Sequence, residues 1–455
     1  MVNAVTKIGF REEEGDEPIY KCDALSTVPK MLKRFLTILL GMFAGSLLAL
    51  GLVQLSSMLG LGQNREIDES AAYIAEVLEL VEKHYVDREL TQLDDLTASA
   101  LKGMLKQLDP HSDYMRAEDY AHLQEDLDSE FGGIGVQIEQ RDGQVVVISP
   151  ISGTPGERAG ILRGDKVVGV NGESMRGETL DRVVDLMRGR PGTPVDVTFE
   201  REGTEDPIEL TIIREKIRVE SVTDVAMIKD GIGYLRLTQF SEPTAEEFKA
   251  ALNRLESEGM RALILDVRNN PGGLLSSVID TLEPFFEKGE LLVYTEGRGI
   301  RNREEFLAQG EAAPKAWPIA VLINSGSASA AEIMAGSLKD TGKAVVLGER
   351  SFGKGSVQSL FRLREGEAMR LTTARYYTPS GVTIHERGVE PQVEVIMTPE
   401  EDRNVALQRI RSDITDPDEF EKRFDMQPVA DRQLEAALAI LEATLVSDRR
   451  KSAAR

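Results

Sequence analysis

The chain has 455 residues, which exceeds one ordinary domain and predicts two to four modules. Its hydrophobic content of 41% and charged content of 29% exclude a wholly disordered protein. The net charge of −23, from 77 acidic and 54 basic residues, argues against a nucleic-acid partner, which would need a basic face. A single cysteine, Cys22, excludes an intrachain disulfide, and the four histidines show no metal-ligand spacing. We therefore expect no metal and no other cofactor.

An uncharged segment from residue 35 to residue 64 is the first feature of the chain. Within it, residues 35–55 are long enough to cross a bilayer core of about 30 Å as a helix. Three basic residues stand directly before this segment: Lys30, Lys33 and Arg34. This charge bias predicts a single-pass anchor that leaves the N-terminus in the cytoplasm and sends everything after residue 65 across the membrane. An uncleaved anchor over residues 31–56 is favoured over a cleaved signal peptide, because no clean A-x-A motif follows.

Residues 1–30 are polar and are interpreted as a cytoplasmic tail or an N-terminal extension. Met31, followed by Leu-Lys-Arg, is a natural start for an export signal. A misassigned start site therefore stays an alternative for these thirty residues.

Residues 66–128 alternate apolar and charged positions at helical spacing. One apolar face consists of Ala72, Ile74, Val77, Leu78 and Val81. The stretch DPHSDYM, Asp109 to Met115, interrupts this pattern and predicts a turn. It contains a histidine, a serine and an aspartate, but neighbouring residues rarely converge on one point. We interpret it as a capping turn that leads into a helix.

Residues 129–217 change to short β-rich runs punctuated by glycine, with one helix around residues 178–189. The run FGGIGVQIE places a Gly-φ-Gly-φ turn before a strand. Such a turn offers backbone N–H groups to an anion, and the strand edge can pair with a peptide. Together, GGIGV, SPISGTPGERAGILRGDKVVGVNG and the helix before RGRPGTPV resemble a PDZ domain of the bacterial type.

The PDZ resemblance implies a partner: a protein or peptide bound by its C-terminus. The carboxylate loop would consist of Gly133, Ile134, Gly135 and Val136. The helix face with Val183 and Met187 would line the peptide groove.

From residue 218 to residue 396, apolar strands alternate with helices, which predicts a sheet covered by helices. After about residue 397 the chain becomes charged and helical. This extension, residues 397–455, could mediate self-association, pack as a helix or form a solvated tail. The predicted fold class is therefore a multidomain α/β (α+β) protein.

The stretch PIAVLINSGSASAAEIMAG predicts a buried strand, a tight turn and a helix. Three serines lie in the turn: Ser325, Ser327 and Ser329. A helix N-terminus favours negative charge, so an oxyanion would be stabilised there. Each serine could equally be an ordinary N-cap.

A nucleophilic serine needs a base, and no histidine is near in sequence. Lys354 follows in GERSFGKGSVQSL with glycines on both sides. A lysine enclosed by apolar strands can lose its proton near neutral pH, and a Ser–Lys pair is a known nucleophile and base. The G-K-G run lacks the spacing of a phosphate-binding loop.

The motifs NSGSASAAEI, D-x-R-x-N-P-G-G and FGKGSVQ resemble those of the C-terminal processing, or tail-specific, peptidases. The resemblance extends over about residues 70–396, including LDPHSDY, the inserted PDZ block and TARYYTPSG. It implies a crotonase/ClpP-like β-α-β protease core. The site residues that it implies are the nucleophile Ser329, the base Lys354, the lysine-orienting Gln358, and backbone N–H donors at Ala330 and at Gly273 with Gly272 beside it. Arg188, at the end of the PDZ helix, resembles an arginine that links peptide binding to the active site in some relatives.

Several polar residues near the site are expected to be structural. Glu332 favours the helix dipole from the first turn, and Asp340 ends the same helix. The segment Arg268 to Asn270 is expected to shape the oxyanion loop. His385 departs from the small or polar residues that relatives carry there, without touching the proposed pair.

The sequence thus predicts a membrane-anchored periplasmic serine endopeptidase that binds substrate tails through its PDZ domain. The first alternative is a catalytically silent PDZ scaffold on a protease fold. The second is a trypsin-like PDZ protease with a Ser-His-Asp triad, which is disfavoured because the PDZ block precedes the serine. A homo-oligomer or an adaptor protein is left open as a further partner.

Overall fold

The computed structural model describes residues 41–43, 45 and 65–453, with gaps at residues 142, 205, 300–301 and 412–413. It divides into two units, residues 1–97 and 98–455. The expected N-terminal extension, and nearly all of the expected anchor over residues 31–56, lie outside the described residues. Among the helices that the structure does describe, none has the length and apolar character to cross a bilayer. The first unit contains the helix α2 (Arg65–His84) and the short η1 (Arg88–Leu90).

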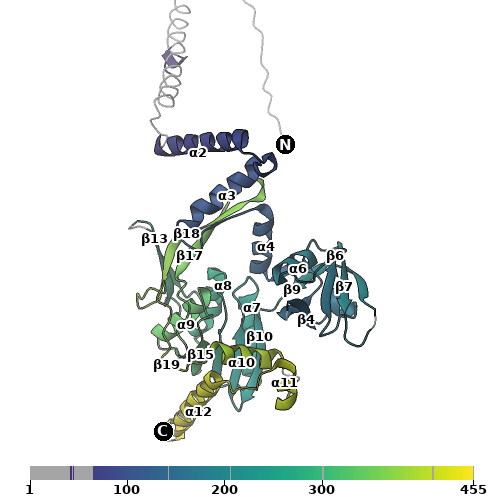
Figure 1. Ribbon diagram of the computed structural model, residues 1–455. Coiled ribbons are helices and arrows are strands. Elements are labelled where there is room, and N and C mark those ends of the chain that lie inside the picture. Colours follow the sequence, from purple (N-terminus) through teal and green to yellow (C-terminus); the bar gives the residue numbers. More distant parts are fainter. Residues whose placement is uncertain are drawn as a thin grey trace, which may run out of the picture. The chain divides into compact units, whose positions relative to one another are not determined.

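The part of the chain after the PDZ block is built on a six-stranded sheet with strand order β10-β11-β12-β15-β16-β19 (Figure 1). Its strands are β10 (Val222–Lys229), β11 (Ile232–Leu237), β12 (Ala262–Asp266), β15 (Ile319–Ile323), β16 (Ala344–Gly348) and β19 (Val393–Glu394). All neighbouring strands from β11 onward run parallel. Every residue of β12 and β15 is buried, because helices cover both faces of the sheet.

Helices α7 (Thr244–Ser257), α8 (Leu275–Leu282) and α9 (Ala330–Asp340) pack against one face of this sheet. The C-terminal helix α12 (Arg432–Ala453) covers the opposite face through Ala437 and Leu441. It follows α10 (Pro399–Ile410) and α11 (Pro417–Phe424). Of the alternatives for the C-terminal extension, the structure therefore shows a packed helix in α12.

A second, antiparallel sheet lies beside the first and carries part of the site. It contains β1 (Asp113–Met115), β13 (Leu291–Gly297), β14 (Arg303–Leu307), β17 (Ser356–Arg362) and β18 (Ala368–Tyr377), with β18 pairing with β1, β13 and β17. Short 3-10 turns η2 (Glu283–Phe285) and η3 (Arg364–Gly366) connect its elements. Helix α3 (Leu93–Lys106) precedes β1 in the chain, and helix α4 (Ala117–Asp128) follows it.

The PDZ block forms its own sheet and core. The sheet contains β3 (Val136–Arg141), β4 (Gln144–Pro150), β5 (Lys166–Val170), β6 (Glu173–Ser174), β7 (Pro194–Glu200) and β8 (Ile208–Ile213), with helices α5 (Pro155–Arg158) and α6 (Leu180–Met187). Strand β3 is at one edge of this sheet. A two-stranded ribbon, β2 (Glu130–Gly133) with β9 (Glu215–Arg218), joins the block to the chain on either side.

Candidate active site

The three candidate serines in the turn between β15 and α9 have different surroundings. Ser327 is fully buried and donates its hydroxyl to the carbonyl of Val267 at 2.8 Å, which is a structural role. Ser325 is exposed. Ser329 is the N-cap of α9 and has φ 53° and ψ −115°, an unfavourable conformation for a residue with a side chain. A strained residue between a buried strand and a helix is the geometry expected of an elbow nucleophile.

The glycine pair that follows β12 lies directly against this elbow. A Cβ atom on Gly272 would stand 2.6 Å from the Cβ of Ser329 and 2.9 Å from the nitrogen of Ala330, so only glycine fits. The N–H of Gly272 donates to Asn270 Oδ1 at 2.8 Å. Among the described residues, the N–H groups of Ala330 and Gly273 have no acceptor. These two N–H groups are therefore free to stabilise an oxyanion beside Ser329, whereas that of Gly272 is already used.

Lys354 lies in the loop before β17. Burial, and then the charge of Arg370, lower the pKa of its ammonium group, while Glu332 acts in the opposite direction. Although the structure describes both residues, it contains no hydrogen bond between the side chains of Lys354 and Ser329. The tertiary structure has brought the two sequence-predicted residues into one site without closing their contact.

The side-chain amide of Gln358 on β17 is hydrogen-bonded through its nitrogen but not through its oxygen. Its Nε2 donates to Ser356 at 3.1 Å and to Thr372 at 2.9 Å. Its Oε1 is buried and has no hydrogen-bond partner among the described residues. A buried acceptor without a donor is costly, so this oxygen suits a cationic or N–H donor that arrives from Lys354 when the site closes.

Glu332 connects the nucleophile to the lysine loop. Its fully buried carboxylate accepts from the N–H of Ser329 at 2.8 Å, and on the lysine side from Gly353 N–H at 2.7 Å, Lys354 N–H at 2.8 Å and the Ser351 hydroxyl at 2.6 Å. Burial raises the pKa of Glu332, and these four hydrogen bonds act to lower it. Sequence reasoning assigned Glu332 only to the helix dipole. Its role in tying two distant loops together was missed, because the lysine loop is far away in sequence.

The turn DPHSDYM also lies beside the site. Asp109 Oδ1 accepts from the backbone N–H groups of His111 and Ser112, which makes the predicted turn. The turn leads into strand β1 and does not cap a helix as predicted, since α4 begins after Arg116 without a side-chain cap. Ser112 Oγ then accepts from the N–H of Thr372, the residue that binds Gln358. Burial and the charge of Lys354 lower the pKa of His111, so its ring lies within the field of the lysine. The turn therefore supports the wall behind Lys354.

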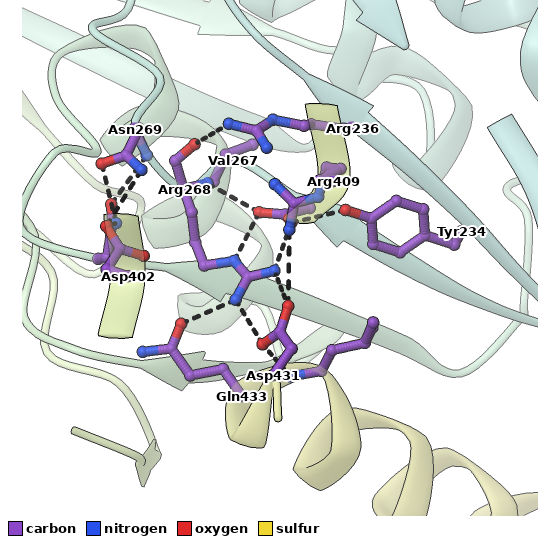
Figure 2. A network of polar contacts seen from close by, with 12 residues as sticks. Tyr234, Arg236, Val267, Arg268, Asn269, Asp402, Arg409, Asp431 and Gln433 are labelled. Atoms are coloured by element: carbon purple, nitrogen blue, oxygen red, sulfur yellow. Dashed lines mark hydrogen bonds and ion pairs between the residues drawn. The ribbon is translucent and has the colours of Figure 1, made fainter. Parts of the chain in front are cut away.

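A buried ion network surrounds Arg268, which follows strand β12 (Figure 2). Arg268 is 2% exposed and donates to Asp266 at 2.7 Å and to Asp431 through two nitrogens, each at 2.8 Å. Gln433 accepts from Arg268 at 3.1 Å, and Arg409 lies 3.5 Å from both carboxylates. Three of these residues belong to the C-terminal segment after residue 397.

The same C-terminal segment reaches the elbow through Asp402 on α10. Its Oδ2 accepts from the side chains of Asn269 at 3.2 Å and Asn324 at 3.1 Å. Asn324 begins the turn that holds Ser329, and Asn269 has φ 57° in the loop that holds Gly273. The C-terminal segment therefore clamps the nucleophile turn and the oxyanion loop together.

Replacing Asp431 by asparagine is expected to lower kcat about tenfold with little change in KM. The substitution weakens two charge-assisted bonds to Arg268, which retains Asp266, so the loss of stability should be about 1–3 kcal/mol. Steady-state kinetics and thermal unfolding measure both quantities. The matched control is Arg201→Gln, which weakens the Arg201–Asp165 pair inside the PDZ block. Equal losses of kcat in the two variants would show that Asp431 acts only on stability.

The lowered pKa of Lys354 predicts how activity depends on pH. Its neutral amine is populated at lower pH than in free lysine, whose pKa is about 10.4. We expect kcat/KM to rise with pH and to level off with a midpoint below that value. Arg370→Gln should move the midpoint upward, because it removes a charge that lowers this pKa. A profile flat from pH 5 to pH 10, with the fold intact by circular dichroism, would contradict Lys354 as the base.

In the loop that is predicted to bind a carboxylate, Gly133 to Val136, two carbonyls accept hydrogen bonds from the rest of the PDZ block. The carbonyl of Ile134 accepts from Gly156 N–H at 2.7 Å, and that of Gly135 from Ile151 N–H at 2.9 Å. In a trans peptide the following N–H points the opposite way, so those of Gly135 and Val136 point away from these partners. Gly133 ends the ribbon strand that leads into this loop.

The other sequence-predicted PDZ residues occupy different surroundings. Val183 and Met187 lie in the core of the PDZ block, at 0% and 4% exposure, so their lining of the groove stays a prediction. Arg188 lies 3.6 Å from Asp126 and over the ring of Phe131. These contacts place Arg188 at the junction of α4 and the ribbon, and within the described chain no hydrogen bond or ion pair joins it to Ser329 or Lys354.

No group of three or more potential metal-binding side chains occurs among the residues that the structure describes.

Two family models match the chain: "Peptidase family S41" over residues 231–395 and "PDZ domain" over residues 146–201. The chain is 39% identical to the carboxy-terminal-processing protease of Bartonella bacilliformis over 358 residues, covering 77% of this chain and 81% of the relative. It is 36% identical to carboxy-terminal processing protease CtpA of Bacillus subtilis over 367 residues, covering 80% and 77%.

Among solved structures, that of a photosystem II D1 C-terminal processing protease is 32% identical, with a TM-score of 0.43, and covers 71% of this chain and 92% of that chain. The chain belongs to peptidase family S41 and is a serine peptidase. Within that family it is a C-terminal processing protease with a PDZ domain.

Proposed function

We propose that this protease is anchored in the bacterial inner membrane by residues 35–55 and cleaves proteins in the periplasm with a Ser329–Lys354 dyad. The main support for Ser329 as the nucleophile is that Gly272 packs against it. Beside it, the N–H groups of Ala330 and Gly273 have no acceptor among the described residues. The location rests on the uncharged segment and the basic residues before it.

In this mechanism the neutral amine of Lys354 removes the proton from Ser329 Oγ as that oxygen attacks the scissile carbonyl. The N–H groups of Ala330 and Gly273 stabilise the resulting oxyanion. When the tetrahedral intermediate collapses, the ammonium of Lys354 protonates the leaving amine. Lys354 then accepts a proton from the water that attacks the acyl-enzyme and returns it to Ser329 Oγ as the acyl–oxygen bond breaks.

The PDZ domain would select substrates by their C-terminal tails. The free carboxylate would bind at the loop from Gly133 to Val136, and the tail would add a strand along the edge strand β3. Substrate binding would move the PDZ domain, with Arg188 at the junction, and bring Lys354 to Ser329, which have no side-chain hydrogen bond in the described chain. The unpaired Gln358 Oε1 would then accept a hydrogen bond from the lysine.

The test uses an unstructured protein substrate with a free C-terminal carboxylate and the same substrate amidated at that end. We expect the full chain to cleave the free-acid form at least tenfold faster, because the amide removes the charge that the loop binds. Equal cleavage of both forms would rule out tail recognition. Equal degradation by the wild type and by Ser329→Ala would favour the silent-scaffold alternative.

A further inference from the structure

An acidic cavity of about 550 Å³ lies outside the dyad, lined by the ends of α4, α7 and α8 and by the ribbon. Four of its carboxylates form no side-chain hydrogen bond or ion pair with any described residue: Asp128, Glu242, Glu246 and Asp280. The one basic residue in its lining, Arg218, is already paired with Glu247 at 2.9 Å. The cavity therefore carries a net negative charge, which Arg218 offsets only in part: it pairs with Glu247, and its charge also acts on Glu130 and Glu246.

A second observation shows that the cavity is short of a partner. Ser277 lies in its wall and is 4% exposed, and its hydroxyl oxygen is buried without a hydrogen-bond partner in the described part of the chain. Buried polar atoms are nearly always satisfied, so this hydroxyl is suited to a donor that enters the cavity. Burial and the neighbouring Glu283 also raise the pKa of Asp280.

The cavity adjoins the oxyanion loop. Ser276 follows Gly273 by three residues, so their Cα atoms lie within about 11 Å of each other. The opposite wall of the cavity begins just after Phe240, at Glu242. The backbone of Phe240 is bonded to the glycine loop: its N–H donates to the carbonyl of Gly272 at 2.9 Å, and its carbonyl accepts from Leu274 N–H at 2.7 Å. Strands β11, β12 and β15 are parallel, so the segments that follow them, including both walls and Ser329, lie at one edge of the sheet.

We propose that this acidic cavity is a substrate subsite for a lysine or arginine side chain close to the scissile bond. At about 3.3 Å per residue of extended chain, the distance to the oxyanion loop places that basic residue within about five residues of the cleaved bond. Its charge would bind the carboxylates, and one of its N–H groups would reach Ser277. The proposal deepens the proposed peptidase function and rests on it.

The test is a set of peptides with one tail and one cleavage site, in which lysine or its uncharged isostere norleucine occupies each position within five residues of the cleaved bond. For the full chain we expect one position where lysine raises kcat/KM about fivefold or more, the effect of about 1 kcal/mol from an ion pair. This preference should shrink as salt rises. Equal kcat/KM for lysine and norleucine at every position, in low salt, would overturn the proposal.

The variant Glu246→Gln/Asp280→Asn should lose the lysine preference and cleave the norleucine peptides as fast as the wild type does. Glu209→Gln, an exposed carboxylate on β8, is the control and should keep the preference. A preference that survives in the double variant would place the basic subsite elsewhere and overturn the proposal.

A binding measurement distinguishes a failure of the proposed subsite from a failure of the proposed catalytic mechanism. The Ser329→Ala protein should bind the lysine peptide more tightly than the norleucine peptide by fluorescence anisotropy, and the double variant should not. If binding discriminates although neither peptide is cleaved, the proposed catalysis fails and the subsite stands. If the norleucine peptide is cleaved normally and binding does not discriminate, the subsite fails and the proposed catalysis stands.

Discussion

Replacing Lys354 by arginine is expected to lower kcat by about 10⁴-fold or more while the protein stays folded. Arginine keeps the positive charge, but its pKa lies far above neutral pH, so it has no neutral form to remove the proton from Ser329. Losing the base of a nucleophile–base pair removes most of the acceleration that the pair provides. Single-turnover cleavage of a tail-bearing peptide, together with thermal unfolding, measures the effect.

Lys339→Arg is the matched control for this substitution. Lys339 lies on α9, in the same core, and its ammonium donates to the carbonyl of Glu390 at 2.7 Å, a contact that arginine can keep. We expect that variant to retain nearly full activity. If Lys354→Arg kept more than a tenth of wild-type kcat, another group would have to be the base.

The second large effect is expected for Glu332→Gln, with kcat reduced about 100-fold. The carboxylate accepts four hydrogen bonds that hold the backbone of Ser329 against the lysine loop. A glutamine amide has one oxygen and one NH₂ group, and the NH₂ group would face donors, so at least one buried N–H loses its acceptor. Misplacing the two loops by a fraction of an ångström is enough to slow the reaction.

The pH profile distinguishes a positioning role of Glu332 from a loss of stability. The negative charge of Glu332 raises the pKa of Lys354, so the glutamine variant should have a lower lysine pKa. The rising limb of kcat/KM should therefore move to lower pH, although the plateau is reduced. A reduced plateau with an unmoved midpoint would mean that Glu332 only supports the fold. Ser351→Ala, which removes one of the four donors, should leave the midpoint where it is.

Much of the architecture was predictable because it depends on local patterns. The continuous apolar runs of β12 and β15 and the helical spacing of α6 are read from a few neighbouring residues. The peptidase family and the PDZ domain were confirmed by the family matches, whereas the roles of Ser329 and Lys354 stay predictions. The predicted membrane anchor stays a prediction, because nearly all of it lies outside the described residues.

The parts that escaped prediction join residues far apart in the chain. Asp431 binds Arg268 across 163 positions, and Asp402 binds Asn324 across 78. No periodic pattern marks such pairs, because an aspartate near a helix start resembles any solvated acid until the fold brings its partner to it.

The amino-acid sequence by itself determined which side chains can perform the chemistry: a serine at a strand-to-helix turn, a lysine between glycines and a glycine loop. Only the tertiary structure decided that Gly272 packs against Ser329, that Glu332 ties Ser329 to the lysine loop, and that no hydrogen bond joins the side chains of Lys354 and Ser329. The physical reason is that residue type sets what a group can donate or accept, whereas burial and distance, which set its pKa and its partners, arise only when separate segments pack together.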